Sequence, residues 1–413
     1  MKGAARYTPT DQLHLWFLSQ PSRPVLVGEL NLVRNPRGVS LKYDPSWLEQ
    51  GFALSEDLPL ISQEFLPLEK DRAAGAVDDA RPDQWGERVI RFIDRPPRLT
   101  LLDFLYFAGH ERFGALGVST SRTAYVPRTL GPLPVLGDVP RLEELVQKVL
   151  HGEPVAERDR RLIAPGVTMG GAKPKALLEL DHRQWVVKFS DGDAVDSPLV
   201  EHASMTLAKE AGIRVATTRP IRLPGGHAVA IERFDRSGDR RVHALSADVA
   251  LRAAGEELGY PELCQLLRRR GSSDEATKVA QMRELFRRMV FNIFLDNTDD
   301  HEKNHVLLVN DAQQYELSPA FDVLPSGQAL GSQQLRVGQH GSESTLENAL
   351  SESALFALSK DQAVGEIRRV VAVVARWRPH FRSHGVSRAD LELLAEQLDR
   401  PFLLDQRGDP SFS

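Results

Sequence analysis

The sequence predicts an α+β protein of more than one domain, with a β-rich N-terminal half and a mostly helical C-terminal half. Before residue 236, short segments alternate apolar and polar residues between turn-forming glycine, proline and asparagine. After residue 245, apolar residues recur every three or four positions, which is the period of a helix. The chain has 413 residues, and single cores stop growing near about 250 to 300 residues. We therefore expect two or three domains.

Composition and charge are those of an ordinary globular protein. Hydrophobic residues make up 41% of the chain, charged residues 26%, and the formal net charge is -5, which disfavours direct DNA binding. The single cysteine, Cys264, excludes an intrachain disulfide and is expected in the core. The sequence shows no secretory leader and no run of about 18 apolar residues. These features predict a cytoplasmic protein without a membrane segment.

The N-terminal half is expected to contain three β-hairpins. Residues 23–43 alternate around the turn sequence NPRG, residues 175–190 form a second pair of strands, and residues 216–235 form a third around PGG. The segment 198–213 between the last two hairpins has helical spacing. Residues 175–235 therefore predict the order strand, strand, helix, strand, strand.

Two further helical patterns flank a candidate linker. Residues 101–116 have apolar helical spacing, and a second helix is expected over 140–153. The linker is expected at residues 125–140, which contain four prolines and two glycines.

The C-terminal half is expected to be built around a helix at residues 274–297. Its apolar positions form one stripe, made of Met282, Leu285, Phe286, Met289, Val290, Ile293 and Phe294. A short hairpin around NDAQ follows at residues 305–318. Three more helices are expected within residues 344–358, 361–377 and 388–398, before a frayed tail at 405–413.

A phosphotransfer pattern follows the long helix. Asn304 comes five residues after Asp299, and Asp322 comes 18 residues after Asn304. Phosphoryl transfer from ATP needs a carboxylate that orients the acceptor hydroxyl, and oxygen ligands that hold Mg2+ on the phosphates. Protein kinases supply these groups in the same order at similar spacing. Neither HRD nor DFG is present as such, and a solvated turn is the alternative for the acidic segment. Asp300 and Glu302 are expected to be solvated bystanders.

A strand lysine and a helix glutamate extend this pattern. The chain has 11 lysines against 41 arginines, so a lysine inside a motif indicates a specific need. Lys188 in WVVKFS is expected to bind nucleotide phosphates, and Glu201 at the start of the following helix is expected to hold it. The alternative for Glu201 is a solvated acid favoured by the helix dipole.

A glycine segment precedes this lysine. Gly170 and Gly171 allow backbone amides to approach an anion closely, while Lys173 and Lys175 add positive charge. The segment matches neither G-x-G-x-x-G nor the Walker pattern, so an exposed glycine turn is the alternative.

The strand ending in AIERFDR reaches the point where the composition turns helical. In a bilobal kinase this junction is the hinge, whose backbone groups read an adenine edge, and Glu232 and Phe234 are the candidates there. The alternative is a strand end with a local ion pair between Asp235 and Arg236.

Five motifs together resemble the HipA family of bacterial serine/threonine kinases, which are the toxins of toxin–antitoxin pairs. The motifs are TMGGAKPKA, WVVKFS, ERFDR, NTDDHEKNH and LSPAFDVLPS, and GELNLVRNPRGVSLKYDPSWL, DLPL and GHERFGALG are similar to the family's first subdomain. The resemblance covers most of the chain. Its central motif is specific, because Asn297, Asp299, His301, Lys303 and Asn304 all match.

The resemblance implies a bilobal protein-kinase-like fold that binds ATP and Mg2+. It implies a HipA N-terminal subdomain at 1–130, a β-rich kinase lobe at 131–236 and an all-helical lobe at 237–413. The implied roles are ATP phosphate binding by Lys188, adenine contact by Glu232 and Phe234, catalytic base for Asp299, and Mg2+ ligation by Asn304 and Asp322. His301 and Lys303 would support either the loop or the phosphates.

The resemblance also implies regulation and partners. Family members autophosphorylate a serine just before the glycine loop, and Thr168 stands at that position here, so its phosphorylation is expected to switch the kinase off. The alternative is a hydroxyl that caps the turn. The expected partner is a small helix-turn-helix, HipB-like antitoxin, through which the protein contacts DNA indirectly.

Three functions remain open from the sequence. The first is a toxin kinase that phosphorylates a protein such as an aminoacyl-tRNA synthetase. The second is a kinase of a small or lipid alcohol, because the phosphotransfer residues do not identify the acceptor. The third is a silent nucleotide-binding corepressor, which the complete set of Lys188, Asp299, Asn304 and Asp322 disfavours.

Overall fold

The computed structural model describes residues 7–163 and 171–409, and the chain divides into two compact units. Unit 1 comprises Met1–Glu179 and Asp235–His243, and unit 2 comprises Leu180–Phe234 and Ala244–Ser413. The first boundary falls inside strand β7 (Lys175–Leu180). The three-domain division expected from the sequence stays a prediction.

Unit 1 contains a mixed sheet in the order β4-β3-β2-β1-β6, with β5 paired in parallel to β3. The predicted N-terminal hairpin is confirmed, because β2 and β3 are antiparallel and turn at Asn35–Pro36. The strands are β1 (Gln12–Phe17), β2 (Val25–Arg34), β3 (Arg37–Tyr43), β4 (Glu64–Phe65), β5 (Arg72–Ala73) and β6 (Leu116–Ser119), with the separate pair β11 (Arg236–Ser237) and β12 (Arg240–Arg241).

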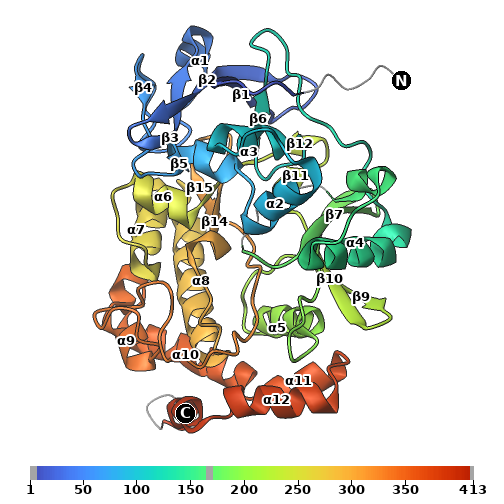
Figure 1. The fold of residues 1–413 in the computed structure, drawn as a ribbon. Helices are drawn as coiled ribbons and strands as arrows, with labels where there is room; N and C mark the ends of the chain where they lie inside the picture. Colours follow the sequence, from blue (N-terminus) through green and yellow to red (C-terminus); the bar gives the residue numbers. More distant parts are fainter. Residues whose placement is uncertain (1–6, 164–170, 410–413) are drawn as a thin grey trace. The chain divides into compact units, whose positions relative to one another are not determined.

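Helices cover this sheet and extend the unit. Helix α3 packs against β1, β2, β3 and β6 (Figure 1). The α-helices are α1 (Pro45–Gln50), α2 (Gln84–Val89), α3 (Leu101–Phe107) and α4 (Val139–His151). Helix α4 confirms the prediction over 140–153. The helical pattern over 101–116 is only partly correct, because Gly109 and Gly114 have φ of 77° and 73° and residues 116–119 form β6.

Unit 2 contains the antiparallel strands β8 (Arg183–Lys188), β10 (Gly226–Glu232) and β9 (Thr218–Leu223), in that order. Helix α5 (Ser197–Glu210) packs on β9 and β10. Together with the preceding β7, these elements confirm the expected order along the chain of strand, strand, helix, strand, strand. A second sheet of β13 (His243–Ser246), β14 (Val306–Val309) and β15 (Tyr315–Leu317) means that the region after residue 237 is mostly helical rather than all-helical.

The long helix α8 (Glu275–Phe294) organises the core of unit 2. All seven residues of its predicted apolar stripe are buried. Helices α7 (Tyr260–Arg270) and α10 (Lys360–Val374) pack against it, and Figure 1 shows α7 to the left of α8 and α10 at its lower end. Cys264 lies fully buried in α7, as expected. Helix α8 therefore fixes the start of the segment that carries Asp299.

The C-terminal helices were predicted incompletely. Helices α10 and α12 (Arg388–Leu398) are present, together with α6 (Ala247–Ala253) and α9 (Leu346–Ser351). Helices α11 (Trp377–Ser383) and α13 (Pro401–Gly408) were not expected. The expectation of a frayed tail from residue 405 is wrong for the start of that segment, because α13 buries Leu403 and Arg407 donates to the carbonyl oxygen of Phe294 at 2.8 Å.

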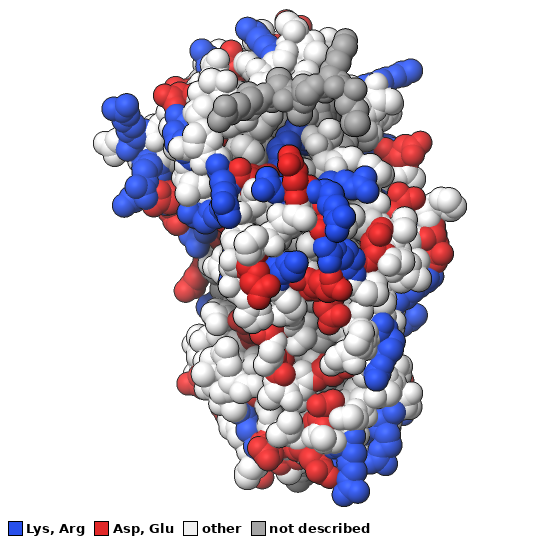
Figure 2. Space-filling view, turned by 45° about the vertical axis from the view of Figure 1, so that its right-hand side comes forward, with Lys and Arg blue, Asp and Glu red and all other residues white. Residues whose placement is uncertain are grey.

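The surface agrees with the low net charge. Basic and acidic side chains are interspersed on the face shown in Figure 2, with uncharged surface between them. No helix of the described part of the chain combines the length and apolar character needed to cross a lipid bilayer.

Candidate active site

Lys188 lies between two carboxylates in unit 2. Its Nζ donates to Oε1 of Glu201 at 2.8 Å and to Oδ1 of Asp322 at 2.5 Å. Lys188 and Glu201 are buried, with exposed fractions of 4% and 3%. The expected lysine–glutamate pair is therefore formed, and Glu201 is not a solvated acid.

The electrostatic environment keeps Lys188 positively charged. Burial alone would lower its pKa, because a low-dielectric surrounding disfavours a cation. The carboxylates of Asp322 and Glu201 outweigh this effect, and the pKa of Lys188 is raised above its ordinary value. A permanently charged ammonium group with two carboxylate partners suits the binding of nucleotide phosphates.

Asp322 has an unusual backbone conformation. Its φ is 57°, in the left-handed region that non-glycine residues seldom occupy. The segment before it is anchored by two backbone hydrogen bonds. The nitrogen of Ala320 donates to the Arg214 carbonyl at 2.7 Å, and the Ala320 carbonyl accepts from the nitrogen of Ala216 at 2.9 Å. Strained residues of this kind cluster at functional sites, which supports a specific role for the Asp322 carboxylate.

The predicted catalytic loop begins where α8 ends. Asp299 is exposed, whereas Asn304 is buried with an exposed fraction of 5%. Nδ2 of Asn304 donates to the carbonyl oxygen of Asp299 at 3.4 Å, so the two predicted residues are in direct contact through the backbone. The side chain of Asp299 is exposed, and its predicted role toward an acceptor hydroxyl stays a prediction.

The donor set fits a magnesium ion. Among the described residues, Oδ1 of the buried Asn304 has no hydrogen-bond partner. An amide oxygen and a carboxylate, here Asn304 and Asp322, are ligands that Mg2+ accepts alongside water and substrate phosphates. Within the described residues, no group of three or more histidine, cysteine or acidic side chains could hold a metal ion.

Asp300 was expected to be a solvated bystander, and that expectation is wrong. Its exposed fraction is 2%, it accepts a hydrogen bond from the Tyr260 hydroxyl, and its Oδ2 lies 2.7 Å from Nε2 of His305. Burial would raise the pKa of Asp300, but His305 and Tyr260 outweigh it and hold the pKa below its ordinary value. The partner Tyr260 lies forty residues upstream, so no local sequence signal distinguished Asp300 from Asp299.

His301 and Lys303 are half-buried and interact with each other. Nδ1 of His301 accepts a hydrogen bond from the backbone nitrogen of Lys303 at 3.2 Å, at the start of the short turn Glu302–Asn304. Of the two predicted roles of His301, this contact favours support of the loop over contact with the phosphates. A phosphate contact by Lys303 stays a prediction.

The predicted hinge residues differ in their surroundings. Oε1 of Glu232 accepts from Arg183 at 2.5 Å, and the backbone nitrogen of Glu232 donates to the Thr217 carbonyl at 2.9 Å. The ring of Phe234 lies 5.3 Å from the ring of Phe321, next to Asp322. The structure therefore brings Phe234 to the Asp322 segment, and adenine contact stays a prediction for both residues. Asp235 and Arg236 form the expected local ion pair, at 2.6 Å.

The glycine segment is described only in part. Thr168 and Gly170 lie outside the described residues. Gly171 has φ of 81°, which favours glycine, and Lys173 is half-buried. Lys175 was expected to add charge to a phosphate site, but it is fully buried and donates to Asp83 at 2.6 Å and to the Gly171 carbonyl at 3.2 Å. That expectation is wrong, because Asp83 neutralises its charge.

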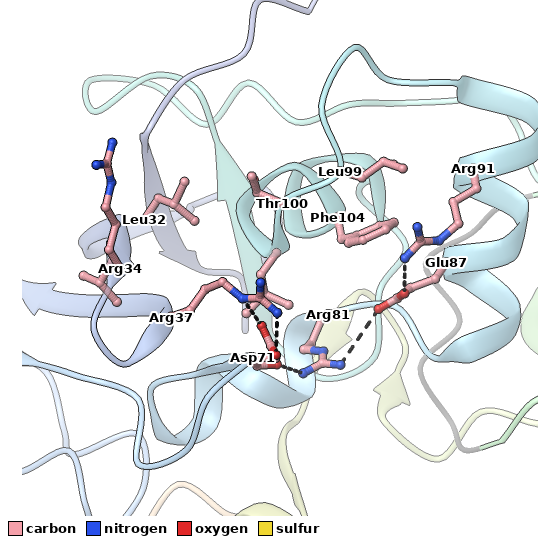
Figure 3. Close-up of a pocket in the computed structure, with 13 residues that line it drawn as sticks. Leu32, Arg34, Arg37, Asp71, Arg81, Glu87, Arg91, Leu99, Thr100 and Phe104 are labelled. Atoms are coloured by element: carbon pink, nitrogen blue, oxygen red, sulfur yellow. Dashed lines mark hydrogen bonds and ion pairs between the residues drawn. The ribbon is translucent and has the colours of Figure 1, made fainter.

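Unit 1 contains a groove of about 480 Å³ between β2, β3, α2 and α3 (Figure 3). Arg37 donates to both carboxylate oxygens of Asp71 at 2.5 and 2.7 Å, and Arg91 donates to Glu87 at 3.1 Å. Of the residues that line this groove, none belongs to the predicted phosphotransfer set. The groove is therefore distinct from the site built on Lys188.

The fold and this site define a kinase-like protein. The HipA N-terminal domain matches residues 24–119, and the HipA-like C-terminal domain matches residues 167–377. The chain belongs to the HipA family.

Two solved structures and one further protein are similar to this chain. HipA of Shewanella oneidensis MR-1, solved with HipB and operator DNA, superposes with a TM-score of 0.66 at 17% identity over 96% of each chain, which shows a shared fold. The Helicobacter pylori kinase CtkA has a TM-score of 0.43 at 14% identity, over 56% of this chain and 88% of CtkA. Y4dM of Sinorhizobium fredii, described as a candidate kinase, is 27% identical over 194 residues. That match covers 43% of this chain and 44% of Y4dM, so the chain spans less than half of this relative's length.

Proposed function

We propose that this protein is an ATP- and Mg2+-dependent serine/threonine protein kinase that acts as the toxin of a toxin–antitoxin pair. The observation that carries the proposal is the position of Lys188, whose Nζ contacts both Glu201 and Asp322. This arrangement joins a phosphate-binding cation to a candidate metal ligand, as phosphotransfer requires. Membership of the HipA family and the fold shared with HipA support it.

Each predicted site residue would have its own role in phosphoryl transfer. Lys188, held by Glu201, would bind the nucleotide phosphates, and Asp299 would accept the proton of the attacking hydroxyl. Asn304 and Asp322 would hold Mg2+, which when bound neutralises charge on the phosphates. Gly170, Gly171 and Lys173 would cover the phosphates, with Glu232 and Phe234 at the adenine.

Regulation is proposed at Thr168. Transfer of a phosphoryl group from ATP to its hydroxyl would release ADP and add about two negative charges beside the phosphate site, which would repel ATP. Intact-mass and peptide analysis after incubation with ATP tests this step. Active protein that carries no phosphate on Thr168 would contradict it.

The proposed antitoxin partner and the proposed phosphate acceptor are based on membership of the HipA family. The solved HipA is in a complex with HipB and its operator DNA, and we propose that this chain binds a small HipB-like helix-turn-helix antitoxin. The proposed acceptor is a protein of translation, such as an aminoacyl-tRNA synthetase.

Incubation of the protein with labelled ATP and Mg2+ in a cell lysate tests the proposal. The expected result is label in protein other than the kinase itself, which an Asp299→Asn variant fails to produce. Label confined to a lipid or a small alcohol would instead identify a small-molecule kinase. Nucleotide binding without any transfer would identify a silent corepressor module.

A further inference from the structure

A buried polar network lies directly beneath the catalytic loop. Its centre is the Asp300 carboxylate, which accepts hydrogen bonds from the Tyr260 hydroxyl and, at 2.7 Å, from Nε2 of His305. The Tyr260 and His305 rings also meet edge to face, with centroids 5.4 Å apart. All three residues are at most 3% exposed.

The network continues into helix α8. Nδ2 of Asn292 donates to the Tyr260 hydroxyl oxygen at 3.3 Å, and Nδ2 of Asn297 donates to Oδ1 of Asn292 at 3.1 Å. The backbone nitrogen of Asn297 also donates to the carbonyl oxygen of Asn292 at 2.9 Å. The loop is therefore tied to α7 through Tyr260 and to α8 through Asn292, both elements of unit 2.

The positions of these residues along the chain give the network a functional meaning. Asp300 directly follows Asp299, and His305 directly follows Asn304. The contact between Asp300 and His305 therefore closes the segment 300–305, which contains Asn304 and directly follows Asp299. A change in this contact would move the Asp299 carboxylate relative to the Asn304 amide.

We propose that Tyr260 is a positioning residue, which acts through Asp300 and His305 to fix the catalytic Asp299 relative to the metal-binding Asn304. This inference rests on the proposed kinase function. Tyr260 is fully buried, so the proposal gives it no direct contact with the acceptor hydroxyl or the phosphates. Its role is to hold the buried Asp300 carboxylate in one orientation. A buried carboxylate that loses a hydrogen-bond donor is destabilised, and its side chain can rotate toward other donors.

A purely structural role for the same network is the competing interpretation. In that case, loss of the Tyr260 hydroxyl would lower stability without changing the rate of the chemical step in folded protein. A positioning role instead predicts a lower kcat at nearly unchanged KM for ATP, because ground-state binding by Lys188 is preserved. Misplacement of a catalytic group by about 1 Å can reduce the rate about 100-fold.

The variant Tyr260→Phe removes one hydroxyl and keeps the ring. We expect kcat to fall at least about tenfold with KM for ATP within about threefold of wild type. We also expect amide hydrogen exchange of a peptide covering residues 297–305 to become at least about tenfold faster, with exchange of residues 25–34 unchanged. Asp300→Asn is the second variant, and it should reproduce both effects.

Tyr43→Phe is the matched control. Tyr43 is also buried, and its hydroxyl donates to the Leu58 carbonyl at 2.8 Å in unit 1. This control loses a comparable hydrogen bond outside the network, so kcat and exchange at 297–305 should match wild type.

The outcomes separate the inference from the proposed function. The positioning role alone would be overturned if the wild-type protein is active and both variants, Tyr260→Phe and Asp300→Asn, keep kcat within about threefold of wild type and show unchanged amide exchange at residues 297–305. Wild-type protein that transfers no phosphate to any acceptor would overturn the proposed function and the positioning role together.

Discussion

Nζ of Lys188 lies 2.5 Å from Oδ1 of Asp322, so the proposed phosphate-binding cation and the candidate metal ligand of this kinase-like protein are in direct contact. Glu201 contacts the same ammonium group at 2.8 Å. Two carboxylates therefore share one buried cation. Removal of that cation would leave two negative charges with their common partner missing, so Lys188 should matter for stability in addition to its proposed role in nucleotide binding.

Lys188→Met is expected to destabilise the protein at pH 8 by about 3 to 5 kcal/mol, the usual cost of breaking a buried ion pair. Without the ammonium group, the pKa of the buried Glu201 should rise, because the cation that Lys188 supplies against its burial is removed. Stability should then improve as the pH falls and the carboxyl group takes up a proton. Urea unfolding at pH 8 and pH 5.5 measures both effects.

The double variant Lys188→Met/Glu201→Gln controls for this explanation. It removes the charge of the Glu201 carboxylate, so it should be more stable than Lys188→Met at pH 8, and its unfolding free energy should depend less on pH. Equal stability of the two variants at pH 8 would show that the buried charge is not the cause.

Asp322→Ala is expected to abolish the effect of Mg2+ on nucleotide affinity. Wild-type protein should bind a non-hydrolysable ATP analogue at least about tenfold more tightly with Mg2+ than with EDTA, because Asp322 would hold the ion and the ion would neutralise charge on the phosphates. Calorimetric titration under both conditions measures the ratio. Asp405→Ala, which changes an exposed acid of α13, should retain it. A wild-type ratio in Asp322→Ala would remove this residue from the metal site.

His243 should make unit 1 less stable in acid. Burial lowers the pKa of His243 to about 4, although its hydrogen bond to the Leu54 carbonyl acts in the opposite direction. The ordinary pKa of histidine is about 6.5, so between pH 6.5 and 4 the unfolded chain binds a proton that the folded chain does not. Stability should therefore fall across this window, by roughly 3 kcal/mol in total.

His243→Gln tests the origin of this loss. Glutamine keeps an N–H donor for Leu54 but does not titrate, so the decline in unfolding free energy from pH 6.5 to 4 should become shallower. His340→Gln, at an exposed histidine, should leave the slope unchanged. An equally steep decline in His243→Gln would assign the acid sensitivity to other groups.

The sequence predicted the elements whose signals are local. The apolar stripe of α8 and the hairpin of β2 and β3 are strong periodic patterns, and both are present. Lys188 could be selected because lysine is scarce and this one ends an apolar strand. Its contact with Glu201 followed from the expected strand and helix order.

The remaining features depend on tertiary contacts. Asp299 and Asp300 are neighbours with the same side chain, but only Asp300 meets Tyr260 and His305 in the core. The sequence suggested Lys175 as a source of positive charge for a phosphate, but its ammonium group pairs with Asp83, 92 positions away. Helix α13 forms at a polar tail because Leu403 and Arg407 dock against the rest of unit 2. Local patterns carry no information on such partners.

The central claim is that Asp299 is the catalytic base of a kinase. The most direct measurement is the single-turnover rate of phosphoryl transfer from Mg2+–ATP by wild-type protein and by Asp299→Asn, with ATP affinity measured on the same samples. We expect Asp299→Asn to bind ATP within about threefold of wild type and to transfer phosphate at least about 100-fold more slowly. Transfer at the wild-type rate by Asp299→Asn would contradict the assignment.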